Sequence, residues 1–146
     1  MSVGELRVQR LHPGARLPAR AHDDDAGYDL CALHDATLQP GERATIATGI
    51  AIELAAGHGG LIVPRSGIAA RHGIAIVNAP GLIDSGYRGE LKVLLLNTDR
   101  DAVFEVSAGD RIAQLVIVAV ATPRIVEADA LAATLRGEGG FGSSGI

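Results

Sequence analysis

The feature that most constrains the fold is a run of alternating side chains at residues 46–54. Every second residue is aliphatic or threonine, in the order Ile46, Thr48, Ile50, Ile52 and Leu54. Because strand side chains point alternately to the two faces of a sheet, this period of two predicts one long strand with one apolar face. The chain is therefore expected to build its core from β-sheet.

Further short apolar runs recur along the chain, with turn-forming residues between them. Pairs such as Pro80-Gly81 favour turns, because glycine accepts positive φ and proline fixes its own φ. Residues 66–73 break the pattern and predict about two turns of helix, with Ser66 as N-cap and Gly73 as terminator. The predicted fold is an all-β, antiparallel, jelly-roll-like barrel or sandwich with one short helix. The other predicted strands lie at residues 6–9, 26–32, 61–63, 91–97, 102–106 and 112–120.

Composition favours a single small domain and narrows the range of partners. A chain of 146 residues predicts one β domain, which we assign to residues 1–135, followed by a flexible glycine-rich arm at residues 136–146. The net charge of −4 argues against nucleic-acid binding, which depends on basic surfaces. The longest apolar run, residues 112–121, contains Gln114 and is too short to cross a bilayer, so no membrane partner is expected.

Cysteine content and hydropathy predict a location and an assembly state. Cys31 is the only cysteine, which excludes an intramolecular disulfide, and residues 1–5 do not resemble a secretion signal. The reducing cytoplasm is therefore the expected location. The mean hydropathy of +0.24 is high for a small domain. We therefore expect apolar surface to be buried between the subunits of an oligomer.

Residues 78–91 place a carboxylate and an aromatic ring among turn pairs, between two β-rich flanks. Such a stretch predicts a hairpin in which Asp84 and Tyr87 border one cleft lined by backbone. The simpler interpretation is an ordinary surface turn with a solvated acid, since loops rich in glycine, proline, asparagine and aspartate are usually only turns. The choice between the two depends on the rest of the chain.

Three polar residues stand in otherwise apolar surroundings. Asp29 lies in an alternating strand, where a buried carboxylate needs compensation, and spacing alone does not separate a turn-capping role from a cation contact. Arg65 precedes the predicted helix, whose unpaired amides favour a phosphate, although ordinary capping would fully explain Ser66. Gln114 is the only amide in its strand and is expected to face a partner or a ligand.

Residues 136–146 differ in character from the rest of the chain. Their glycine content predicts mobility, yet the segment also carries Arg136, Phe141 and two serines. Consecutive amides and hydroxyls can surround a phosphate, and a ring between glycines can stack on a planar ligand. A frayed tail is the alternative, but it gives no reason for a phenylalanine in a chain that has only two.

Taken in order, five segments resemble the five motifs of the trimeric dUTPase family: residues 26–32, 64–74, 78–91, 109–117 and 136–145. One segment alone would be a weak match, whereas five in this order form a specific pattern that spans nearly the whole chain. The resemblance implies hydrolysis of dUTP to dUMP and pyrophosphate with Mg²⁺, which limits uracil incorporation into DNA and supplies dUMP for dTMP synthesis. It also implies a homotrimer whose three sites combine segments of different subunits.

The resemblance further implies roles for individual residues. Asp84 is similar to the group that activates the attacking water, and Tyr87 to the platform under deoxyribose that excludes a ribose 2′-hydroxyl. Asn78, with the loop backbone at Gly81 and Ile83, would bind uracil. Asp29 would hold water ligands of Mg²⁺. The other implied substrate-binding residues contact phosphates or close over the site, and they are Arg65, Ser66, Gly67, Gln114, Arg136, Phe141, Gly142, Ser143 and Ser144.

Two alternatives remain from the sequence. A dCTP deaminase resembles dUTPases in fold, but its reaction needs a carboxylate in the strand after the hairpin, and residues 91–96 contain none. A non-catalytic nucleotide-binding trimer would keep the fold, but Asp84, Gln114 and the complete tail count against it.

Overall fold

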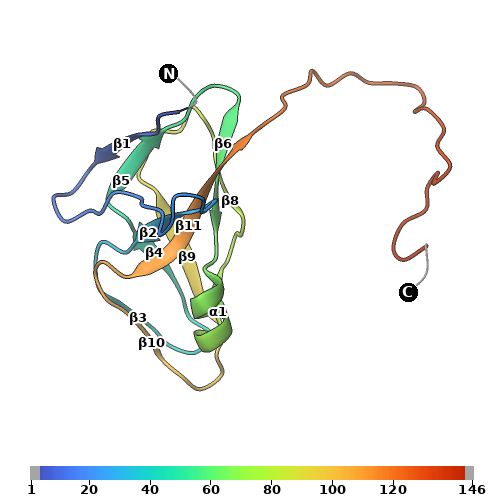
Figure 1. The fold of residues 1–146 in the computed structure, drawn as a ribbon. Helices are drawn as coiled ribbons and strands as arrows, with labels where there is room; N and C mark the ends of the chain where they lie inside the picture. Colours follow the sequence, from blue (N-terminus) through green and yellow to red (C-terminus); the bar gives the residue numbers. More distant parts are fainter. Residues whose placement is uncertain (1–3, 144–146) are drawn as a thin grey trace.

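The computed structural model describes residues 4–143 and has the all-β architecture that the sequence predicts (Figure 1). Within that range the elements are, in chain order, β1 (Arg7–Arg10), β2 (Tyr28–Cys31), β3 (Ala36–Leu38), β4 (Arg43–Ala47), β5 (Ile50–Glu53), β6 (His58–Val63), α1 (Ser66–His72), β7 (Ile74–Ile76), β8 (Gly81–Ile83), β9 (Lys92–Asn97), β10 (Phe104–Val106) and β11 (Arg111–Ala119). The predicted strands at residues 6–9, 26–32, 61–63, 91–97, 102–106 and 112–120 are thereby confirmed within a few residues at their ends.

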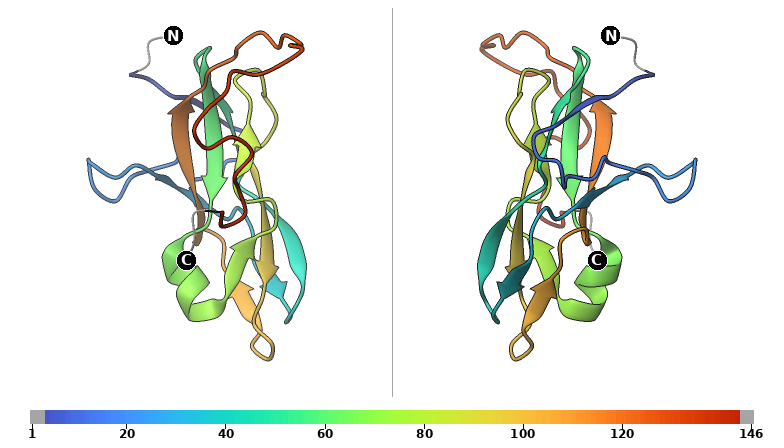
Figure 2. Two further views of the ribbon diagram at one scale, coloured as in Figure 1. Left: turned by 90° about the vertical axis from the view of Figure 1, so that its right-hand side faces the viewer. Right: turned by 90° about the vertical axis from the view of Figure 1, so that its left-hand side faces the viewer.

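The paired strands of the described chain all run antiparallel and form four small sheets. The largest sheet has the strand order β2-β11-β6-β8, and the others are β4-β9-β7, β1-β5 and β10-β3. Figure 2 shows them as two facing layers with α1 at one end. The arrangement confirms the predicted antiparallel, jelly-roll-like class.

The core between the layers is aliphatic, as expected for a chain with two tyrosines, two phenylalanines and no tryptophan. Each large aliphatic side chain that is fully buried contributes about 1.5–3 kcal/mol relative to an exposed position. Both layers supply such side chains, and the largest are Leu30, Leu38, Ile50, Ile74, Leu91, Leu95, Ile112 and Leu115.

The single long strand predicted at residues 46–54 is wrong, because the chain breaks there into β4 and β5. Gly49 lies between them with φ of 70°, and a Cβ at this position would lie 2.9 Å from the Cβ of Ala15. β4 pairs with β9 whereas β5 pairs with β1, so the break passes the chain from one sheet to another. Every residue of the predicted apolar face, from Ile46 to Leu54 in steps of two, is buried on both sides of the break, and the sequence period therefore does not reveal it.

The predicted helix is present, but its N-cap is one residue earlier than expected. Arg65 has the extended backbone of an N-cap, no side chain caps the helix, and Ser66 is the first helical residue. The prediction of Ser66 as N-cap is therefore wrong. Gly73 is confirmed as terminator, since its φ is 64° and its N–H donates to the carbonyl oxygen of Ala69.

The loop predicted as a hairpin links both layers of the fold. β7 and β9 pair directly, as a hairpin requires. Between them the chain forms β8, which crosses to the larger sheet and pairs with β6. The crossing was not predicted, because a three-residue strand within a turn-rich loop has no periodicity of its own.

After β11 ends at Ala119, the described remainder of the chain has neither helix nor strand. Figure 1 shows residues 120–143 running away from the sheets. Among residues 4–143, no helix has the length and apolarity needed to cross a bilayer.

One buried amide connects three parts of this framework. Asn97 is fully buried at the end of β9, and its Nδ2 donates to the carbonyl oxygens of Leu38 (3.0 Å) and Ala102 (2.9 Å). Its Oδ1 accepts a hydrogen bond from the backbone N–H of Asp99 over 3.0 Å. The side chain thus joins β9 to β3 and to the turn that precedes β10.

Replacing Asn97 by alanine should lower the free energy of unfolding by about 2–4 kcal/mol, since several buried backbone groups lose their partner. Chemical denaturation at a fixed protein concentration measures the change. Asn78→Ala is the matched control, because the same side chain is removed at an exposed position and the expected loss is below about 0.5 kcal/mol. Equal losses in the two variants would contradict this role for Asn97.

Candidate functional site

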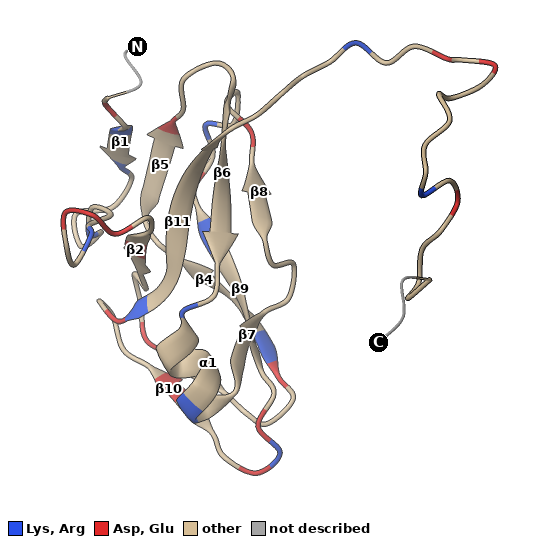
Figure 3. Ribbon diagram, turned by 45° about the vertical axis from the view of Figure 1, so that its right-hand side comes forward, with Lys and Arg blue, Asp and Glu red and all other residues tan. Residues whose placement is uncertain are grey.

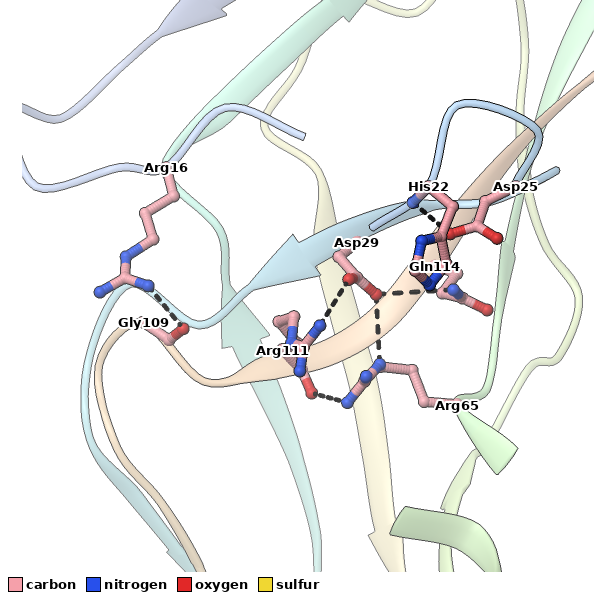
Figure 4. A network of polar contacts seen from close by, with 8 residues as sticks. All are labelled: Arg16, His22, Asp25, Asp29, Arg65, Gly109, Arg111 and Gln114. Atoms are coloured by element: carbon pink, nitrogen blue, oxygen red, sulfur yellow. Dashed lines mark hydrogen bonds and ion pairs between the residues drawn. The ribbon is translucent and has the colours of Figure 1, made fainter. Parts of the chain in front are cut away.

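A buried carboxylate lies at one end of the four-stranded sheet and has two cationic neighbours. Asp29 in β2 is 9% exposed; its Oδ1 lies 3.2 Å from Nε of Arg65 and its Oδ2 lies 3.2 Å from Nη1 of Arg111. Nε2 of Gln114 donates to Oδ1 over 3.5 Å, and Nη1 of Arg65 donates to the carbonyl oxygen of Arg111 over 3.1 Å. Figure 4 shows the four side chains converging, and we call them the Asp29 cluster.

Strand register explains why these residues meet. Gln114 of β11 lies opposite Asp29 of β2 on one side and opposite Val63 of β6 on the other. Arg65 follows β6 by two residues and so reaches the same end of the sheet, where Figure 3 shows basic residues both before α1 and at the start of β11. Gly27 leaves room for the amide, because a Cβ there would lie 3.2 Å from Cβ of Gln114.

The geometry answers the question that the sequence left open for Asp29. In the described chain its carboxylate contacts cationic and amide side chains, and it caps no turn. Nearby, a hollow of about 360 Å³ is lined in part by Cys31, Arg16 and Arg111. Burial raises the pKa of the Cys31 thiol above its ordinary value, although Arg16 acts in the opposite direction. The thiol is therefore neutral at physiological pH.

A second group of predicted site residues lies in the loop between β7 and β9. The side chain of Asn78 lies over Gly81, where a Cβ would be 3.4 Å from its Nδ2. Tyr87 is 44% exposed, and its hydroxyl donates to the carbonyl oxygen of Glu90 over 3.1 Å. Asp84 is exposed, and within residues 4–143 its carboxylate has no hydrogen-bond or ion-pair partner. Its carboxylate is thus open to water.

The two groups are far apart within one chain. β8 and β2 are the opposite edges of the sheet with two strands between them, which separates them by about 14 Å. Along the strands, Asp29 is level with Val63, whereas Asp84 directly follows Ile83, which is level with Gly60. That offset adds about 13 Å. The predicted site residues therefore form two separate groups within one chain.

The remaining predicted residues lie at α1 and in the tail. Ser66 and Gly67 open α1 beside the Asp29 cluster. In the described tail, Arg136 Nε donates to the carbonyl oxygen of Gly139 over 2.7 Å, and Phe141, next to Gly142, is fully exposed. The N–H of Ser143 donates to the carbonyl oxygen of Gly140 over 3.0 Å. Ser144 lies outside the described residues.

Arg111 belongs to the Asp29 cluster, although the sequence analysis did not single it out. It lies three residues before Gln114, and in a regular strand two such residues point to opposite faces. The register of β11 against β2 shifts between Arg111 and Ala113, however, so both side chains reach Asp29. A β-bulge of this kind has no clear sequence signal, although the glycine turn before Arg111 marks where a strand irregularity is tolerated.

Comparisons with known proteins agree with the resemblance. The dUTPase family model matches residues 14–145. Deoxyuridine 5′-triphosphate nucleotidohydrolases of Thermobifida fusca and Rhodococcus erythropolis are 55% and 53% identical over 140 residues, covering 96% of this chain and 78% and 85% of those proteins. A dUTPase of Staphylococcus bacteriophage 80alpha, solved with dUPNHPP, has a TM-score of 0.93 at 33% identity and covers 98% of this chain and 99% of its own. A dUTPase variant of the S. aureus phage phi11, solved to describe coordination of a structural Mg(II) ion, has a TM-score of 0.83 at 29% identity over 88% of this chain and 99% of its own.

Removing either arginine of the Asp29 cluster leaves the carboxylate with one cation, but the two substitutions should lower the free energy of unfolding by different amounts. The Arg65 side chain is 24% exposed and that of Arg111 is 54% exposed. Arg65→Ala should therefore lower the free energy of unfolding by about 2 kcal/mol, because a largely buried charge loses its partner. Arg111→Ala should cost less than about 1 kcal/mol. Denaturant titration measures the free energy of unfolding of both variants. A larger decrease for Arg111→Ala than for Arg65→Ala would contradict the prediction.

Proposed function

The chain belongs to the dUTPase family, and on that premise we propose how it hydrolyses dUTP to dUMP and pyrophosphate. Its relatives are named for this activity. The proposal rests on the separation of the predicted site residues into the Asp29 cluster and the loop that bears Asp84 and Tyr87. One group has the donors that a phosphate chain requires, and the other has a rigid loop suited to a nucleoside. Hydrolysis by this chain removes dUTP before it enters DNA and provides dUMP for dTMP synthesis.

The Asp29 cluster is the phosphate half-site. Arg65 supplies a guanidinium, and the N–H groups of Ser66 and Gly67 open the first turn of α1, where they have no helical carbonyl to bond. Gln114 adds a side-chain amide on the same end of the sheet. Fixed donors of this kind stabilise the charge that develops on phosphate oxygens when water attacks the α-phosphorus.

The loop between β7 and β9 is the nucleoside half-site. Asn78 and the backbone of β8 at Gly81 and Ile83 bind the uracil edge. Pairing with β6 holds this backbone in place, so a wrong base would leave polar groups of the backbone unpaired. The Tyr87 ring lies under deoxyribose. Asp84, with its carboxylate open to water, is the general base that takes a proton from the attacking water.

The distance between the half-sites supports the sharing of sites between subunits. A triphosphate with its nucleoside cannot engage both halves of one chain if they lie at opposite edges and opposite ends of the sheet. A neighbouring copy of the chain can supply the missing half. We therefore assign the sites to a homotrimer in which adjacent subunits contribute different halves.

An apolar strip on the sheet supports this assembly. Val116, Leu61 and Leu82 lie side by side on β11, β6 and β8, on the face that points away from the core. Leu82 is 64% exposed, and Val120 continues the strip beyond β11 at 39% exposure. A contiguous apolar surface of this kind marks an interface. We assign it to a second copy of the chain, because it runs from one half-site toward the other.

The segment after β11 supplies the remaining contacts. Its described part extends away from the sheets, so it can reach a neighbouring subunit (Figure 1). Arg136, Phe141, Gly142 and Ser143 have only local contacts or are exposed in the free chain. With Ser144, they close over the base and the γ-phosphate once substrate is bound.

The residues of the cluster fit a Mg²⁺ ion that the substrate brings with it. The described residues contain no group of three His, Cys, Asp or Glu side chains that would hold a metal by themselves. Mg²⁺ commonly keeps several waters and binds through one carboxylate and substrate phosphates, which suits Asp29 as a partner of its water ligands. When bound, the ion neutralises charge on the phosphate chain. The single cysteine also fits the reducing cytoplasm as the location of the enzyme.

Pyrophosphate release in the presence of Mg²⁺ should be fast from dUTP and slow from dCTP, dTTP and UTP. Asp84→Asn should lower kcat for dUTP at least ~100-fold, since general-base assistance of that size is lost. Binding of dUPNHPP should persist in this variant, because the phosphate half-site is intact. Turnover close to that of the unaltered enzyme would remove Asp84 from the mechanism.

Sharing of sites predicts complementation between two inactive variants. Asp84→Asn disables the nucleoside half and Arg65→Ala the phosphate half. If the two chains are co-expressed and assemble at random, about a quarter of the sites should combine two intact halves and regain activity. Each variant alone, with its trimer verified by size-exclusion chromatography, is the control. Activity no greater than the mean of the separate variants would place each site within one chain.

A further inference from the structure

The Tyr87 ring is held by residues of its own loop. Its hydroxyl bonds to the carbonyl oxygen of Glu90, and its backbone N–H donates to the carbonyl oxygen of Asp84 over 3.0 Å. The ring is thereby folded back over the residues that follow it. Part of the residue stays open to solvent, since it is 44% exposed.

Gly89 provides the space that this ring occupies. A Cβ built on Gly89 would overlap Oη and Cζ of Tyr87 and lie 2.9 Å from its Cε2. Gly89 is not among the described glycines with positive φ, so alanine would not strain the backbone there. An alanine at position 89 would instead push the ring out of its place. Gly86, in the same loop, also lacks a positive φ and has nothing within 4 Å of a built Cβ.

Arg88 fixes the turn on which the ring is carried. Its Nη1 donates to the carbonyl oxygens of Ser85 (2.7 Å) and Tyr87 (2.9 Å). Its Nη2 lies 3.6 Å from Oε1 of Glu53, at the end of β5. One guanidinium therefore holds two carbonyls of the turn and ties the turn to the sheet, which a lysine ammonium is poorly shaped to do.

The base of the loop is fixed to the same region of the fold. The Gly49 N–H donates to Oε1 of Glu90 over 2.9 Å, and the N–H of Leu91 donates to the carbonyl oxygen of Ile50 over 2.8 Å. The loop is thus attached to the β4–β5 connection on one side and to Glu53 on the other. The orientation of the ring relative to the sheets is set before any substrate arrives.

We propose that Gly89 and Arg88 are positioning residues that set the Tyr87 ring and so determine how well the enzyme separates dUTP from UTP. The inference rests on the proposed role of Tyr87 as the platform under deoxyribose. A ring that stays in place leaves no room for a 2′-hydroxyl, whereas a displaced ring admits it. Neither residue contacts the reacting atoms, and both act through the ring and its turn.

The glycine pair offers a matched test of the first half of the proposal. The ratio of kcat/KM for dUTP to that for UTP should fall about tenfold in Gly89→Ala, since small displacements of positioned groups have effects of that order. In Gly86→Ala, which adds the same methyl group to open space, the ratio should stay within about twofold of the unaltered enzyme. Equal ratios in the two variants would overturn the role of Gly89.

The arginine pair tests the second half. Arg7 Nη1 lies 3.0 Å from Oε2 of the same Glu53 side chain, and among residues 4–143 it forms no hydrogen bond or ion pair with the loop. Arg88→Ala and Arg88→Lys should each lower the dUTP/UTP ratio about tenfold, while Arg7→Ala should leave it unchanged. If Gly89→Ala does not yield a folded trimer, the Arg88 variants decide the proposal. A ratio in Arg88→Ala that matches Arg7→Ala would overturn the role of Arg88.

Tyr87→Ala separates failure of this inference from failure of the proposed function. A lower ratio in Tyr87→Ala with unchanged ratios in Gly89→Ala and Arg88→Ala would leave the platform role intact and refute the positioning role. An unchanged ratio in Tyr87→Ala would refute both, because the ring would then not discriminate between the sugars. A fall in all three variants, with both controls unchanged, is the expected result.

Discussion

The interaction on which the site depends is the contact of one buried carboxylate with two guanidinium groups. Asp29 is only 9% exposed in its sheet, and Arg65 and Arg111 face its two oxygens and compensate the buried charge. The three residues come from β2, from the segment before α1 and from the start of β11, so their contact brings together three parts of the chain. The same contact holds the Arg65 side chain at the end of the sheet, next to the first turn of α1. The contact that packs these parts of the fold together therefore also orients the side chain that we propose for phosphate binding.

The features that depend on local sequence pattern could be predicted, whereas those that depend on contacts between distant parts of the chain could not. The alternation through Ile50 and Ile52 correctly gave β-structure and burial, but the change of sheet at Gly49 depends on contacts with Ala15 and Leu33 that no local pattern encodes. Asp29, Arg65 and Gln114 were recognised as polar residues in unusual places, and the structure brings them together. Arg111 was missed because a bulge, visible only in the register of two strands, turns it to the same side as Gln114.

Under the proposed assignment, strand order keeps a single chain from forming a complete site. β8 pairs with β6, and this pairing fixes the loop that bears Asp84 and Tyr87 at the sheet edge opposite β2. No rearrangement of side chains spans that distance, since strand spacing and register are set by backbone hydrogen bonds. The apolar strip of Val116, Leu61 and Leu82 lies on the face between the two half-sites. Burying this strip against another copy and completing the site are thus linked in the proposed trimer.

An acidic chain can bind a triphosphate if positively charged donors are oriented in advance at the site. The net charge of −4 repels polyanions at long range, so attraction must come from donors placed in advance. Arg65 uses Nε for Asp29 and Nη1 for the Arg111 carbonyl, and a guanidinium has five N–H donors, so several remain for the proposed phosphate contact. Its contact with Asp29 therefore orients the guanidinium without exhausting it. A lysine at position 65 would offer a single ammonium to Asp29 and to phosphate alike, and the two anions would compete for it.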